Sequence, residues 1–225
     1  MRELASRIPL PRHRAADLER YRGRLASFAT TSGERFVASC WDESPFGSWG
    51  GLLVAEADGC RTLYVESEIL ADDVRLLHGI DNVVLADVRI ARAGQEWAVE
   101  VDPVEGPPLS RLTLTLGSPT RRGAVISRLP LSVTETRGFA WFTEIMLRVL
   151  SLGVPSFRAV YAVGRLRDGR REHHCARGER VITAVSGTYT GRPLGNLTDL
   201  TACGFGFSDP PRHPAVGEMT ALRQR

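Results

Sequence analysis

Apolar and polar residues alternate in short runs along most of the chain, a pattern typical of strands that bury one face. Turn sequences separate several of these runs, among them Ser44-Pro45-Phe46-Gly47 and Asp168-Gly169. The pattern predicts strands at residues 36–41, 49–55, 60–66, 82–90, 97–101, 109–116, 157–166 and 181–189. Residues 125–133 are interrupted by Pro130 and therefore predict an edge strand or an irregular one.

Helical periodicity is confined to two segments. Residues 138–152 predict one long helix, because their large apolar residues recur every three or four positions. Residues 15–25 predict a short helix with three apolar residues on one face. Residues 68–73 are interpreted as a polar connection that leads to a tight turn at Gly79.

These elements predict an α+β fold, with a predominantly antiparallel β-sheet or barrel, one long helix and one short helix. Strands and helices do not alternate along the chain, which argues against a doubly wound parallel sheet. We expect a single domain over residues 1–225, in which residues 1–14 and 215–225 are flexible tails.

The amino-acid composition excludes several kinds of reaction and partner. The 225 residues carry a net charge of +3, and every basic side chain other than histidine is arginine. Without lysine, no side-chain amine is present to form a Schiff base with a carbonyl compound. Basic and acidic residues are interleaved, so the clustered positive charge of a nucleic-acid-binding surface is absent. No apolar run approaches the roughly 20 residues of a membrane span, and the first residues lack the apolar core of a secretion signal, which together predict a cytoplasmic protein.

Cofactor and metal motifs are missing from the sequence. It has no Walker loop, no dinucleotide-binding glycine fingerprint and no nucleophile elbow, so we expect no cofactor. The run Glu172-His173-His174-Cys175 has metal-competent side chains, but neighbouring residues of a strand point to opposite faces, so we expect no metal site. The cysteines form no C-x-x-C pair and predict free thiols: Cys40, Cys60, Cys175 and Cys203.

Two stretches carry a resemblance to a known family. The first is Ser44-Pro45-Phe46-Gly47-Ser48-Trp49, a Ser-Pro-x-Gly turn that leads to an aromatic residue at the start of a strand. The second begins with Val65-Glu66-Ser67, at the end of a predicted strand, and continues through Arg75 and Gly79. In these positions, and in the order of elements over residues 35–116, the chain resembles the acetoacetate decarboxylase superfamily.

The resemblance implies an acetoacetate decarboxylase-like fold and a homo-oligomer, together with a change of chemistry. The family's Schiff-base lysine falls on Asn82, and the acid that follows the family's aromatic residue falls on Gly51. An amide can donate and accept hydrogen bonds, but it cannot condense with a ketone. Any reaction must therefore rest on orientation, acid–base help or electrostatic stabilisation.

Four residues in and after the second stretch are the predicted catalytic group: Glu66, Arg75, His78 and Asn82. Arg75 would hold an anionic oxygen, and His78 or Glu66 would move a proton. Asn82 would orient the carbonyl group. The alternative is that His78 and Asn82 only satisfy the backbone of a turn, while Arg75 pairs with a neighbouring aspartate, Asp72 or Asp73.

Aromatic residues supply the predicted binding surface. Trp41 and Trp49 would form walls of an apolar ligand pocket, because such pockets are built mostly from aromatic and aliphatic side chains. Packing in the core is the open alternative for both. At the start of the long helix, Thr134 or Thr136 is the expected cap, with Glu135 favoured by the helix dipole.

The sequence therefore favours a small-molecule enzyme that acts without a Schiff base: a cyclase or lyase that cyclises, dehydrates or decarboxylates a keto acid or polyketide-like intermediate in specialised biosynthesis. A non-catalytic binding protein for a hydrophobic metabolite or an assembly partner is the open alternative. A third possibility is a thioester- or lipid-handling fold, in which the sheet wraps around helix 138–152. Nucleic acid and membrane are not expected as partners.

Overall fold

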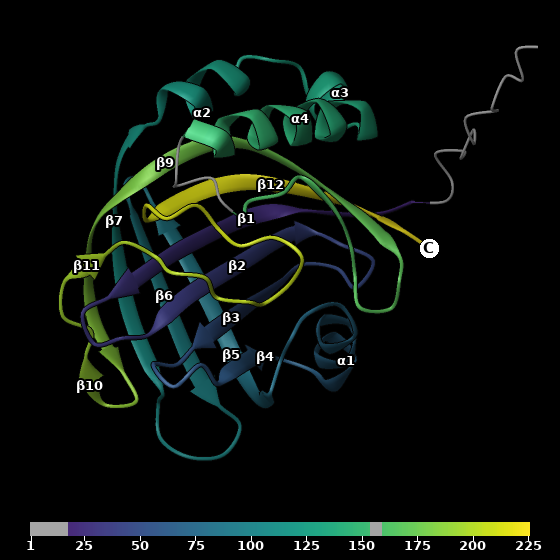
Figure 1. Cartoon of the computed structure of the whole chain (residues 1–225). Helices are drawn as coiled ribbons and strands as arrows, with labels where there is room; N and C mark the ends of the chain where they lie inside the picture. The colour runs from purple at the N-terminus through teal and green to yellow at the C-terminus, as the bar shows by residue number, and fades with distance from the viewer. Residues whose placement is uncertain (1–17, 154–158) are drawn as a thin grey trace, which may run out of the picture.

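A single sheet of twelve strands dominates the computed structural model, which describes residues 18–153 and 159–225 (Figure 1). The strands are β1 (Leu18–Thr30), β2 (Arg35–Glu43), β3 (Trp49–Ala55), β4 (Arg61–Val65), β5 (Asn82–Ala93), β6 (Glu96–Pro103), β7 (Ser110–Pro119), β8 (Val163–Arg165), β9 (Arg171–Tyr189), β10 (Arg192–Pro193), β11 (Leu197–Thr198) and β12 (Ala215–Gln224). Their order is β10-β9-β12-β1-β2-β3-β4-β5-β6-β7, and a further pairing between β7 and β9 closes the path into a ring. The predicted, predominantly antiparallel sheet is confirmed.

The described residues contain four helices: α1 (Glu68–Leu77), α2 (Arg121–Ile126), α3 (Leu131–Thr134) and α4 (Arg137–Gly153). The predicted long helix is confirmed as α4, and the Thr136 hydroxyl accepts a hydrogen bond of 3.1 Å from the Phe139 N–H at its start. The expected total of one long and one short helix is wrong. None of the four helices is long and apolar enough to cross a membrane.

The predicted short helix at residues 15–25 is wrong over its described part, because residues from Leu18 onward belong to β1. This strand pairs with β12 on one side and β2 on the other. Backbone hydrogen bonds to two neighbours, and burial between them, outweigh a local periodicity that fitted a helix equally well.

The polar connection predicted at residues 68–73 is instead helix α1. Ser67 caps it, since its hydroxyl accepts a hydrogen bond of 3.4 Å from the Leu70 N–H. Leu70, Ala71 and Val74 pack against the outside of the sheet. This helix joins β4 to β5, which pair in parallel, so the chain contains one strand–helix–strand unit that the sequence analysis had excluded.

Residues 125–133, expected to form an edge strand, instead contribute to helices α2 and α3 and their connection. The Thr120 hydroxyl caps α2 by accepting a hydrogen bond of 3.0 Å from the Gly123 N–H, and Pro130 precedes α3. The strand expected at residues 157–166 is reduced to β8, while residues 157 and 158 lie outside the described part.

The expectation of a flexible tail at residues 215–225 is wrong. Strand β12 lies inside the sheet, paired with β1 on one side and β9 on the other. The sequence of β12 is polar because two of its buried residues bind charged side chains: Thr220 binds Glu135, and Arg223 binds Asp73. The other predicted tail, residues 1–14, lies outside the described residues.

The ring of strands encloses the main hydrophobic core. Every strand of the ring contributes to it, and aromatic residues fill much of the space. Phe28 and Phe36 stack with their ring centroids 4.9 Å apart, and Tyr189 meets Phe36 edge to face at 5.3 Å. We call the surface of the strands that points into this core the core face.

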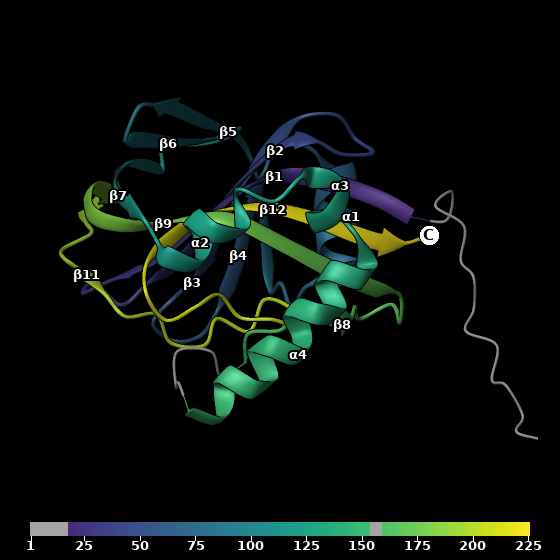
Figure 2. The same cartoon turned by 90° about the horizontal axis from the view of Figure 1, so that it is seen from above.

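Smaller layers cover the outside of the ring. Helix α4 packs against β8 and β9 on the outside, as Figure 2 shows, so the possibility of a sheet wrapped around this helix is wrong. Residues 199–214 cross the outer surface of β2 and β3 (Figure 1), where Leu200, Cys203 and Phe205 pack onto the sheet. The space beneath this segment contains the candidate site.

Candidate functional site

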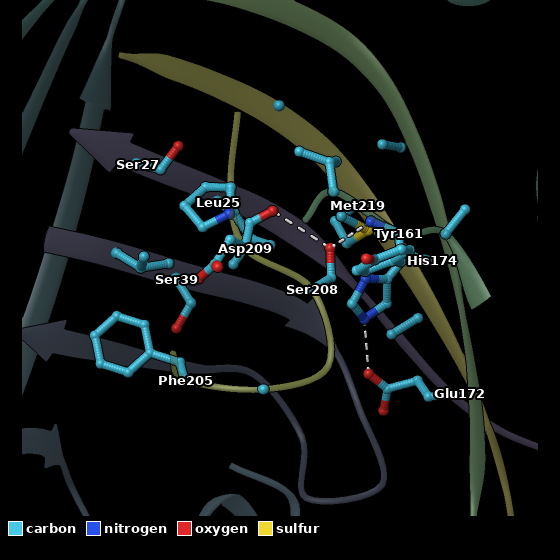
Figure 3. A pocket seen from close by; sticks show the side chains of 18 of the residues that line it. Leu25, Ser27, Ser39, Tyr161, Glu172, His174, Phe205, Ser208, Asp209 and Met219 are labelled. Carbon is cyan, nitrogen blue, oxygen red and sulfur yellow. Dashed lines mark hydrogen bonds and ion pairs between the residues drawn. The ribbon is translucent and has the colours of Figure 1, made fainter. Parts of the chain in front are cut away.

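A cleft of about 280 Å³ lies between the outer surface of six strands and the segment that crosses them (Figure 3). Strands β9, β12, β1, β2, β3 and β4 form its floor, and residues 205–211 form part of its cover. The floor exists because side chains alternate along a strand: Leu25 and Ser27 line the cleft, whereas Ala26 and Phe28 belong to the core. We call this outer surface the cleft face.

Most of the cleft face is apolar. Trp41 and Trp49 lie together on neighbouring strands, with ring centroids 6.2 Å apart, and the Trp49 indole N–H donates a hydrogen bond of 3.2 Å to the Ser44 hydroxyl. Both tryptophans line the cleft and also pack in the hydrophobic cluster beneath helix α1, so their part in ligand binding stays a prediction. Further apolar side chains line the same cleft: Leu25, Val37, Leu53, Leu63, Phe205 and Met219.

A buried ionic network occupies one end of the cleft, with Arg223 at its centre. The Arg223 guanidinium donates hydrogen bonds to Glu172 Oε2 at 2.9 Å and to Asp73 Oδ2 at 2.9 Å. The same group donates to the Tyr21 hydroxyl at 2.7 Å and lies over the Tyr21 ring at 4.3 Å. Arg223 is only 5 % exposed, so these partners replace the water that a guanidinium would otherwise bind.

His174 extends the network into the cleft. Its Nε2 lies 2.8 Å from Glu172 Oε1 (Figure 3). Its ring packs against Phe207, with the centroids 4.7 Å apart. Burial alone would raise the pKa of Glu172, but the hydrogen bond from His174 and the charges of His174 and Arg223 outweigh it and lower that pKa to about 2. Glu172 is thus a carboxylate that fixes the imidazole ring of His174.

A second imidazole, that of His78, also lines the cleft. His78 ends helix α1, and its backbone N–H donates to the Val74 carbonyl at 2.9 Å. Its Nδ1 atom is buried without a hydrogen-bond partner among the described residues, and a Cβ on Gly206 would lie only 2.7 Å from that atom. Burial lowers the pKa of His78, opposed by the nearby charge of Glu172, so the ring is neutral near pH 7.

The cover of the cleft is tied down by hydrogen bonds at both ends. Asp209 Oδ1 accepts from the N–H groups of Cys203 and Gly204, both at 2.9 Å. The Ser208 hydroxyl accepts from the Tyr161 N–H at 2.9 Å, and the Gly79 N–H donates to the Phe205 carbonyl at 2.6 Å. These bonds hold the cover over the floor.

The structure divides the catalytic group predicted from the sequence. His78 lines the cleft, but Glu66, Arg75 and Asn82 are exposed and do not contribute to it. Asn82 Nδ2 lies 3.0 Å from Cys60 Sγ, at the start of β5. The alternative, in which Arg75 pairs with Asp72 or Asp73, is not seen among the described residues either, and Asp73 binds Arg223.

The structure adds residues that the sequence analysis did not bring together. Glu172 and His174 are two apart on β9, which places both on the cleft face, while His173 points to the opposite face. The spacing of two residues on a strand could have predicted that Glu172 and His174 share one face of the sheet. Arg223 carried no such signal, because it lies in a segment that was interpreted as a tail.

Comparisons with known proteins do not identify a family or an activity for this chain. No family model and no curated protein matches the sequence. The chain is similar in structure to an acetoacetate decarboxylase from Legionella pneumophila, with 9% identity, a TM-score of 0.42 and coverage of 98% of this chain and 90% of that chain. A second structure, from structural studies of acetoacetate decarboxylase, gives 8% identity, a TM-score of 0.41 and coverage of 95% and 88%. At this level the similarity assigns no activity to the chain.

Proposed function

We propose that this chain is an enzyme of small-molecule metabolism that binds a mainly apolar keto compound in the cleft and transfers a proton through His174, without a Schiff base. The observation that carries the proposal is the 2.8 Å contact between His174 and Glu172 in the wall of an apolar cleft. A carboxylate that orients an imidazole ring is the usual arrangement of a histidine acid–base catalyst.

The hydrogen bond to Glu172 determines which nitrogen of His174 reacts. Nε2 faces the carboxylate and donates its proton to it, so Nδ1 is the atom left to exchange a proton with the substrate. Cyclisation, dehydration and decarboxylation of a keto acid all create or consume charge next to a carbonyl group. In a dehydration or cyclisation, His174 takes the proton from the carbon next to the carbonyl, whereas in a decarboxylation the enolate left by the loss of CO₂ takes a proton from the His174 imidazolium. Glu172 stabilises the imidazolium in both cases.

His78 takes a second role in this proposal. Its ring lines the cleft and packs against the bound substrate, while its Nδ1 is buried beside Gly206. Trp41 and Trp49 bind the apolar part of the substrate. Glu66, Arg75 and Asn82 are left out, because all three lie on the exposed surface outside the cleft.

The test compares His174→Gln with Asn82→Ala. Each variant is incubated with a panel of β-keto acids, including acetoacetate, in D₂O, and the release of CO₂ and the incorporation of deuterium are followed by NMR. His174→Gln should lower turnover by about 10² to 10⁴-fold, the usual contribution of an acid–base group. Asn82→Ala should retain the wild-type rate. Full activity of His174→Gln, or loss of activity in Asn82→Ala alone, would contradict the assignment.

A second candidate function, a binding protein for a hydrophobic metabolite, is favoured by the apolar lining of the cleft. The two functions differ in the fate of the ligand. A binding protein returns every bound compound unchanged, and His174→Gln then alters affinity and nothing else.

A further inference from the structure

A second cavity, of about 270 Å³, adjoins the cleft and shares part of its wall. Phe205, Gly206 and Phe207 line both. The other residues around the second cavity are Gly79, Arg165, Leu166, Arg167 and Gly204. This lining contains two arginines and no acidic side chain, so the cavity is electropositive, in contrast to the cleft.

Two guanidinium groups converge beside Gly79. A Cβ on this glycine would lie 2.6 Å from Arg61 Nη1 and 3.2 Å from Arg167 Nη2. The two nitrogens are therefore within about 6 Å of each other, a distance at which like charges repel unless an anion lies between them. Only a residue without a side chain allows this approach.

The charges of these arginines are unequally balanced. Arg61 is neutralised by Asp81, with Nε to Oδ2 at 2.9 Å and Nη2 to Oδ1 at 3.1 Å. The charge of Arg167 also acts on Asp81, whose pKa is lowered first by its hydrogen bonds with Arg61 and then by the charges of Arg61 and Arg167, so one carboxylate serves both arginines. Arg165 donates only to the Gly169 carbonyl, at 3.1 Å. Asp209, the acid in the covering segment, is already bound to two backbone N–H groups.

We propose that the second cavity binds the phosphate group of a small molecule. A guanidinium group binds a phosphate oxygen at about 2.7–2.9 Å, so an oxygen between two nitrogens about 6 Å apart reaches both. A phosphate monoester carries a charge of about −1.5 to −2 near pH 7. That charge matches the charge of about +2 that remains when the single carboxylate of Asp81 is set against Arg61, Arg165 and Arg167. The site uses none of the residues assigned to proton transfer.

The experiment measures binding of inorganic phosphate, glycerol phosphate and acetate by calorimetry, at constant ionic strength and with chloride as the reference anion. Inorganic phosphate and glycerol phosphate should bind with saturation, and acetate at least ten-fold more weakly. Tighter binding of the ester would identify a phosphorylated metabolite as the source, and equal binding would identify free phosphate.

Three variants decide whether the arginines are responsible. Arg167→Gln and Arg165→Gln should each weaken phosphate binding at least ten-fold, while Arg128→Gln, an exposed arginine on the other side of the cleft, should not. Because all three side chains are exposed, the variants should fold. Absence of saturable binding in the wild-type protein, or unchanged binding in Arg167→Gln, would overturn the proposal. Neither result depends on the activity of His174.

A separate observation concerns helix α4, whose outer face is apolar and exposed. Phe142, Ile145, Val149 and Leu152 are 60 %, 59 %, 58 % and 87 % exposed. Their spacing of three, four and three residues is that of the a and d positions of a coiled coil. With Trp141 and Met146, each 42 % exposed, they form a row of six exposed apolar side chains on one helix, and exposed apolar patches of this kind mark interaction sites.

We infer that a second copy of this chain covers the apolar face of α4. The face has no charged residue along its seam, so it is complementary to itself, as a two-fold interface requires. Six exposed apolar side chains along helix α4 form the apolar centre of an interface, to which each partner of a stable complex contributes about 800 Å². This interface also accounts for the homo-oligomer expected from the sequence.

Analytical ultracentrifugation over a concentration series tests this interface. The wild-type chain should sediment as a dimer at micromolar concentration, and Ile145→Asp should shift it to a monomer. Ile69→Asp is the matched control, because Ile69 is 68 % exposed on α1 and away from α4. A monomeric wild-type chain, or equal association of wild type and Ile145→Asp, would reject the interface.

Discussion

On strand β1, Ala26 and Phe28 point into the closed core, while Leu25 and Ser27, one residue away in each case, line the cleft. The two faces of the sheet thus come from the same strands but differ in what they bury. The core face holds apolar side chains almost throughout. Its polar exception is Tyr189, whose hydroxyl donates to Glu56 at 2.7 Å and lies 2.9 Å from the Tyr64 hydroxyl.

The cleft face combines apolar walls with a buried ionic network. A network of this kind contributes little net stability, since desolvation of the charges offsets their attraction. It does hold Glu172 and His174 in one orientation. The comparison indicates that the core face stabilises the fold. The cleft face adds less stability, because its buried charges lose their hydration, but it holds a few reactive groups in fixed positions.

The largest expected effect is on the core face. Phe36→Ala should lower the free energy of unfolding by about 3–5 kcal/mol, because the fully buried ring leaves a cavity between Phe28 and Tyr189. Urea denaturation with an unchanged m-value measures this loss. A loss below about 1 kcal/mol would mean that the core is less tightly packed than the structure shows.

The next largest effect is on the ionic network. Arg223→Met should lower the free energy of unfolding by about 3 kcal/mol, because Glu172 and Asp73 then lack their shared cation. Thermal and urea unfolding measure it. The matched control is Arg89→Met, which removes an arginine from exposed ion pairs and should lower the free energy of unfolding far less than Arg223→Met does.

Acid should weaken the network in a defined range. The pKa of Glu172 is lowered from 4.5 to about 2 in the folded protein, by His174 and Arg223 against the effect of burial. Its contribution to stability is therefore complete above pH 4.5 and is lost as the pH falls toward 2. Unfolding measured between these values should show a shallower loss for Glu172→Gln than for the wild-type chain. If the free energy of unfolding fell with pH equally in the wild-type chain and in Glu172→Gln, the pKa of Glu172 would not be lowered by this network.

The smallest effects should separate the two faces at neighbouring positions. Ala26→Ser places a hydroxyl without a partner in the core and should cost about 1–3 kcal/mol. Ser27→Ala, on the cleft side, should change the free energy of unfolding by less than about 0.5 kcal/mol. Urea denaturation measures the free energy of unfolding of both variants. An equal loss in the two would contradict the assignment of the two faces.

Part of the site was visible in the sequence. Trp41 and Trp49 could be placed at a pocket from residue type, and alternation placed His173 and His174 on opposite faces. The grouping of Arg75, His78 and Asn82 followed from their closeness in the chain. The structure separates these residues. Arg75 on α1 and Asn82 at the start of β5 are exposed outside the cleft, and His78 lines the cleft.

The sequence by itself determined the strands with regular alternation, the turns between them and helix α4, because these depend on local spacing and on residues that prefer one backbone geometry. Only the tertiary structure decided the state of residues 18–25 and 215–224, whose neighbours in the sheet are nearly two hundred residues away in sequence. It also decided the site. Arg223 meets Glu172, Asp73 and Tyr21 only after the sheet has formed, and contacts between residues so distant along the chain leave no periodic trace in any one segment.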